Sequence, residues 1–101
     1  MNWTEIYLKY KDTELMKELE KSLGCSYDLS KYTIQEAWGI IICFAEEDKG
    51  IEIFAPDCQI WDTKKDNYVL LAEHGECGDG KQMEFEQAML WCADKFFEVV
   101  K

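Results

Sequence analysis

The densest group of chemically reactive side chains lies in the segment from His74 to Gly80, which also holds Cys77 and Asp79. Imidazole, thiolate and carboxylate groups are ligands that zinc accepts, and Cys58 could supply another thiolate. Zinc ligands usually come as two close pairs, however, and only one close pair is present here. We therefore expect no metal and no cofactor, and we keep a small metal-binding protein or enzyme built on this loop as an alternative.

Cys77 and His74 could also form a nucleophile and its base. A catalytic thiolate needs a lowered pKa, whereas the neighbouring Glu73, Glu76 and Asp79 would raise the pKa of this thiol. Chance pairs of carboxylates are expected among 21 acidic residues, and none stands at a spacing typical of hydrolysis. The sequence also lacks an EF-hand loop and a phosphate-binding loop. We therefore expect a protein that is not an enzyme.

Charge is the strongest signal in the sequence. The chain has 101 residues, 21 acidic against 11 basic, and a formal net charge of −10; every basic residue is a lysine. Residues 1–31 hold six acids and five lysines, so residues 32–101 carry nearly all of the excess. Proteins that bind DNA, RNA or anionic membranes need clustered cations, so we expect none of these partners. The excess indicates either a solvated acidic surface that only keeps the protein soluble, or a face that meets a basic protein.

The last expected helix suggests where such a face could lie. If Phe85 marks the centre of its buried side, Trp91 points to the opposite side among polar residues. Tryptophan surrounded by polar groups is a common anchor of protein interfaces, although a tryptophan can equally be covered by a neighbouring segment. The predicted partner-binding residues on this helix are Trp91, Glu84, Gln87, Asp94 and Glu98.

A second acidic group, which includes Asp57, surrounds another tryptophan. Its members come from an expected turn and from two expected strands, and a turn tip is often charged simply because it is solvated. The predicted partner-binding residues of this group are Trp61, Asp62, Glu46, Glu47, Asp48 and Glu52.

Five cysteines, an odd number, suggest free thiols in a reducing compartment. We expect Cys43 and Cys92 to be small core residues. The chain shows no apolar signal-peptide region, and its longest apolar run, Trp38–Ala45, is too short to cross a bilayer. We therefore predict a cytoplasmic protein.

Hydrophobic periodicity predicts the elements that must position these residues. Alternation at Ile6–Tyr10 predicts a strand, and Leu15, Leu19 and Leu23 predict a helix that starts after Asp12 or Thr13. Residues 38–46 are ambiguous: the isoleucine run favours a strand, whereas a capping box formed by Thr33 and Glu36 favours a helix over 34–46. We choose the strand.

The rest of the chain is expected to alternate between turns and short strands before one final helix. We predict a turn at Glu46–Gly50, strands at Ile51–Ala55, Gln59–Asp62 and Tyr68–Glu73, and a helix at Lys81–Val100. The prediction is one α+β domain over residues 1–101, with two helices on an antiparallel sheet of four to five strands in the order β-α-β-β-β-β-α.

These features favour a non-catalytic inhibitor whose acidic face occupies the basic groove of a nucleic-acid-handling enzyme, as a mimic of nucleic acid. Small phage proteins that block CRISPR nucleases or restriction enzymes are similar in composition, being short, acidic and single-domain. That likeness is one of composition and not of motif. An immunity protein or antitoxin that neutralises a basic toxin is an alternative, and a homodimer would also cover exposed aromatic residues.

Overall fold

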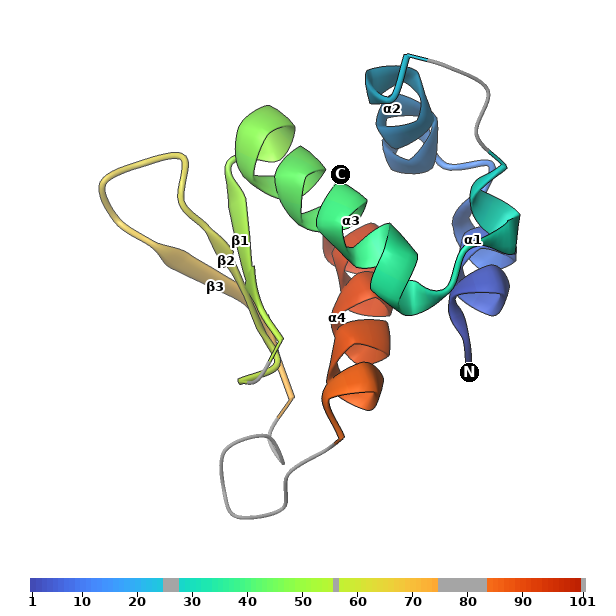
Figure 1. The fold of residues 1–101 in the computed structure, drawn as a ribbon. Helices are drawn as coiled ribbons and strands as arrows, with labels where there is room; N and C mark the ends of the chain where they lie inside the picture. The colour runs from blue at the N-terminus through green and yellow to red at the C-terminus, as the bar shows by residue number, and fades with distance from the viewer. Residues whose placement is uncertain (25–27, 56, 75–83, 101) are drawn as a thin grey trace.

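The observed order of helices and strands differs from the predicted order. The computed structural model describes residues 1–24, 28–55, 57–74 and 84–100 (Figure 1). Its order is α-α-α-β-β-β-α, with a short 3₁₀ helix before the third α-helix. The elements are α1 (Trp3–Tyr10), α2 (Glu14–Ser22), η1 (Leu29–Lys31), α3 (Ile34–Lys49), β1 (Ile51–Phe54), β2 (Gln59–Asp62), β3 (Val69–Glu73) and α4 (Phe85–Val99). The α+β class is confirmed; the predicted strand number, helix number and element order are wrong.

The elements form three layers (Figure 1). The antiparallel sheet has the strand order β1-β2-β3. Helices α3 and α4 lie against one face of this sheet, and α1 and α2 pack on the other side of those two helices. Within the described ranges, no helix or strand covers the second face of the sheet.

The strand predicted at Ile6–Tyr10 is part of helix α1. Asn2 caps the helix by accepting a hydrogen bond from the backbone N–H of Glu5 at 2.9 Å. Trp3, Ile6 and Tyr10 are buried at three- and four-residue steps, which is helical spacing. A short alternating run fits the strand period of two, and it also fits the helical period of 3.6 when the residue four positions away is apolar. Tertiary packing then decides between strand and helix.

The strand predicted at residues 38–46 is also wrong, because this segment lies inside helix α3. The capping box is complete: Thr33 Oγ1 accepts from the N–H of Glu36 at 3.2 Å, and the Glu36 carboxylate accepts from the N–H of Thr33 at 3.0 Å. This pair satisfies two backbone N–H groups that lack a backbone partner at the start of a helix. A strand at this place would not have these unpaired groups. The predicted turn at Glu46–Gly50 is instead the last helical turn, which Gly50 ends in the left-handed conformation.

Several predicted elements are confirmed with small changes at their ends. Thr13 caps α2, β2 spans Gln59–Asp62 as predicted, and β1 and β3 are each one residue shorter than expected. Helix α4 begins at Phe85; residues 81–83 of the predicted helix lie outside the described residues.

The described cysteines lie in different environments. Cys92 is buried, as predicted, but Cys43 lies on the exposed side of α3, so its assignment to the core is wrong. Cys58 is disulfide-bonded, so the prediction of free thiols is also wrong at this residue. Residue spacing does not reveal which sulfur atoms a fold brings within bonding distance. Among the described helices, none is long and apolar enough to cross a membrane.

Gly39 inside α3 and Gly50 at its C-terminal cap give a matched test of this helix. Gly50 has φ +63°, and a Cβ there would collide with the side chain of Lys64, whereas Gly39 lies mid-helix with open space around it. We expect Gly50→Ala to lower the free energy of unfolding by about 1–2 kcal/mol, and Gly39→Ala to raise it by roughly 0.5–1 kcal/mol through helix propensity. Urea denaturation measures both. A destabilising Gly39→Ala would contradict an exposed helical position.

Candidate functional site

The uncovered face of the sheet carries the best candidate site. The register pairs Glu52 with Trp61 and Phe54 with Gln59, while Ile51, Ile53 and Ile60 belong to the opposite face, toward α3 and α4. Side chains alternate between the two faces of a strand, so one set is buried and the other points outward. We call the outward set the open face; it consists of Glu52, Phe54, Gln59, Trp61, Tyr68, Leu70 and Glu73.

A β-bulge completes this face on β3. Ile60 pairs with Ala72 but Trp61 pairs with Leu70, so Leu71 is an extra residue between the two pairs. A bulge shifts the alternation of its strand by one position. Leu71 and Ala72 therefore both pack toward the core, and Leu70 lies beside Trp61 on the open face.

The open face is unusually apolar for a surface. Phe54 is 41 % exposed, Tyr68 is 61 % exposed and Leu70 is 39 % exposed. Single exposed apolar residues are normal, but neighbouring ones indicate an interaction surface. Three of the seven large exposed apolar side chains found among the described residues lie here.

A shallow pocket of about 270 Å³ opens on this face; we call it the aromatic pocket. Its walls are Phe54, Asp57, Gln59, Trp61 and Tyr68. The Trp61 indole N–H donates to Gln59 Oε1 at 3.1 Å, and Gln59 Nε2 donates to Glu73 Oε1 at 3.3 Å. This chain of hydrogen bonds links β2 to β3 and fixes the orientation of the indole ring.

The turn between β1 and β2 sets the place of Asp57. The backbone N–H of Cys58 donates to the carbonyl of Ala55 at 3.1 Å, and Cys58 adopts a positive φ of 49°. A residue with a side chain enters this left-handed region at a cost, so the surrounding structure must hold it there. Cys58 is fully buried and disulfide-bonded, which anchors the turn and keeps Asp57 exposed beside the aromatic pocket.

Charge on the open face is wholly negative. Glu52, Asp57 and Glu73 lie on or beside it, and none of the residues of β1, β2 and β3 is a lysine. Asp62 ends β2 and is partly neutralised, because its carboxylate accepts from the Lys64 backbone N–H at 3.0 Å and lies 3.6 Å from Lys64 Nζ.

The predicted face on α4 is not arranged as expected. Phe85 is 56 % exposed and does not mark the buried side; that side is formed by residues such as Cys92 and Phe96. Trp91 is half-buried against the core, with its ring edge-on to His74 at 5.2 Å between centroids. Asp94 contacts α1, where it accepts from the Tyr10 hydroxyl at 2.9 Å and from Lys9 Nζ at 3.1 Å.

The other predicted residues lie apart from each other. Glu84 and Gln87 are exposed near the start of α4, and Glu98 near its end pairs with Lys95 at 3.0 Å. Glu46, Glu47 and Asp48 are exposed on the last turn of α3, and the last two border a groove beside α2 rather than the open face. The structure thus brings Trp61 and Glu52 together on the open face and separates the α4 and α3 groups from it.

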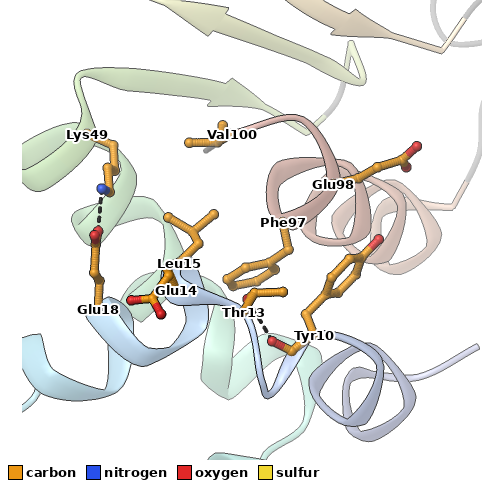
Figure 2. Close-up of a pocket in the computed structure, with 9 residues that line it drawn as sticks. All are labelled: Tyr10, Thr13, Glu14, Leu15, Glu18, Lys49, Phe97, Glu98 and Val100. Atoms are coloured by element: carbon orange, nitrogen blue, oxygen red, sulfur yellow. Dashed lines mark hydrogen bonds and ion pairs between the residues drawn. The ribbon is translucent and has the colours of Figure 1, made fainter.

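A second cavity, of about 500 Å³, lies where the ends of α1, α2, α3 and α4 meet. Figure 2 shows Leu15, Phe97 and Tyr10 around its centre, and the ion pair of Glu18 with Lys49 at one side. This pair joins α2 to α3, and two further carboxylates line the cavity: Glu14, and Glu98, which pairs with Lys95.

Groups suited to covalent chemistry are not grouped in the part of the chain that the structure describes. Burial raises the pKa of the Cys92 thiol to about 12, so this thiol stays protonated and is a poor nucleophile. No group of three or more metal-binding side chains is present within the described ranges. Cys77 and Asp79, from the loop predicted as an alternative site, lie outside them.

Sequence reasoning identified Trp61 and Glu52 but missed three walls of the aromatic pocket, Phe54, Gln59 and Tyr68. The signal was available in the alternation of β1 and β2: three isoleucines at matching positions assign one face to the core, and the remaining residues must face outward.

Comparison with known proteins gives no further guidance. No family model, no curated protein and no solved structure matches this chain.

Two acidic residues of α4 can be separated by their contacts. Asp94→Ala removes the acceptor of the Tyr10 hydroxyl, and we expect it to lower the free energy of unfolding by about 1–2 kcal/mol. Glu98→Ala removes only an exposed ion pair, which is worth roughly 0–1 kcal/mol. Urea denaturation of the two variants compares them. Equal effects would mean that the contact of α4 with α1 through Asp94 adds no more to stability than an exposed ion pair.

Proposed function

We propose that this chain is a non-catalytic protein-binding inhibitor, and that its open face occupies the basic groove of a nucleic-acid-handling enzyme. The observation that carries the proposal is the composition of that face. Exposed Phe54 on β1, Leu70 on β3 and Tyr68 just before β3 lie among carboxylates, and the three strands hold no lysine.

The two kinds of residue would have separate roles in binding. Glu52, Asp57 and Glu73 would take the places of phosphate charges, because a groove that binds nucleic acid is lined with cations. The aromatic residues would exclude water, and they would fill the space that a stacked base occupies when the enzyme binds nucleic acid. The net charge of −10 on the whole chain would add long-range attraction that speeds the encounter.

The same surface argues against self-association as its main role. Two copies would bring two carboxylate-flanked faces together, and like charges across an interface oppose binding. A partner of opposite charge removes this conflict.

The proposal is tested by capturing the partner from the native host on the immobilised chain and identifying it by mass spectrometry. The purified partner is then used to compare two triple variants. Glu52, Asp57 and Glu73 are changed to Lys in one variant; Glu46, Glu47 and Asp48 are changed to Lys in the other. Each triple changes three charges by +2, from −10 to −4, so the two differ only in position.

We expect the open-face triple to slow association by about tenfold or more at low salt, and the α3 triple to slow it much less. Phe54→Ala should speed dissociation, whereas Leu8→Ala, which shortens another exposed apolar side chain, should not. The partner should lose its activity when one equivalent of the chain is added. Equal effects of the two triples, or a captured partner without a basic groove, would overturn the proposal.

A further inference from the structure

We infer that the aromatic pocket is the receptor for one arginine side chain of the partner. This inference rests on the proposed function and specifies the chemistry at the centre of its interface. Three aromatic rings, from β1, from β2 and from the residue just before β3, line one space next to a carboxylate.

The aromatic walls favour a cation. Phe54, Trp61 and Tyr68 all line the pocket, and an aromatic ring presents negative charge on its face. A cation within about 6 Å of such a face is attracted, most strongly by tryptophan. Asp57 is exposed at the same pocket and has no ion-pair partner among the described residues, so it adds a full negative charge.

The polar groups of the pocket favour a cation over an anion. The Trp61 indole N–H is already used by Gln59 Oε1, and one N–H of the Gln59 amide donates to Glu73. The Tyr68 hydroxyl and the second Gln59 N–H can still donate, but among the lining residues the charge is carried by the Asp57 carboxylate, which is an acceptor only. The pocket therefore favours a ligand that brings donors and positive charge.

Guanidinium fits this requirement better than ammonium. Its plane stacks on aromatic faces, it loses hydration more easily, and it can bind a carboxylate through two parallel hydrogen bonds. Arginine is also enriched among the residues that contribute most to interfaces, and it is common in grooves that bind nucleic acid.

The occupant must come from another protein. The chain contains 11 lysines and no arginine, so a second copy could not supply a guanidinium group. The absence of arginine and the presence of an arginine receptor are thus consistent with a chain that binds a different protein.

The test uses three capped amino acids as probes at low ionic strength: Nα-acetyl-arginine amide, the same derivative of citrulline, and the same derivative of lysine. Citrulline has the shape of arginine without its charge. Binding is followed by NMR through the indole N–H of Trp61, which the Trp61→Phe variant assigns among the four tryptophans.

We expect capped arginine to bind with a millimolar Kd, and capped citrulline to bind about five- to tenfold more weakly. Asp57→Asn should weaken arginine binding by roughly threefold or more through the loss of its charge. Asp66→Asn, at an exposed position in the turn between β2 and β3, is the matched control and should leave it unchanged.

Equal binding of arginine and citrulline would overturn the inference, and so would equal binding of lysine and arginine. Tetramethylammonium serves as a fourth probe, and its tighter binding would overturn the inference as well, because that result identifies a cage for quaternary ammonium. If the pocket ignores arginine while the open-face triple still slows association, this inference fails and the proposed function stands. If the triple associates normally, the proposed function fails whichever probe binds.

Discussion

The fold depends on the burial of one helical layer from both sides. Within this layer, Phe96 of α4 meets Phe44 of α3 edge-on at 6.3 Å between ring centroids. On one side α4 contacts β2 and β3, and on the other side Phe97 stacks on Tyr10 of α1 at 5.8 Å. A helix that presents apolar side chains in both directions can only be stable between two other layers. The sheet supplies one of these layers and α1 with α2 supplies the other (Figure 1).

In this arrangement the core is complete with only one face of the sheet buried. One face of each strand completes the core through residues such as Ile51 and Ile60, which are both at most 1 % exposed. The other face contributes little to that core, so its composition is not restricted by packing. Apolar side chains on such a face have no structural reason to be there, which is why their presence at Phe54 and Tyr68 argues for a partner.

The sequence predicts elements well where one local signal dominates and poorly where two signals compete. Helix α2 and the three strands follow from periodicity and turn chemistry. In α3 the isoleucine run and the capping box disagree, and the capping box prevails because it satisfies specific backbone N–H groups. In α4 the existence of the helix is predictable, but its rotation is not, because the large apolar side chain of Phe85 in the first turn is exposed.

The candidate site shows the same limit. Trp61 and Glu52 could be identified from their types, since an indole among carboxylates stands out in any sequence. Their neighbours on the open face depend on strand register. Strand β3 contains an extra residue, and neither turn chemistry nor strand propensity predicts it. Trp91 looked equally suitable, yet only tertiary structure shows that it packs against His74.

The bulge at Leu71 has a consequence for how this protein can vary. Strand β3 has one more residue than β2 between the pairs Ile60–Ala72 and Trp61–Leu70. This extra residue sets which side chains of β3 face the core. Deleting that residue would rotate every side chain on one side of the deletion through half a turn, exchanging a core position for a solvent position. A substitution in β3 keeps this register, whereas a change of length within the strand would exchange its two surfaces.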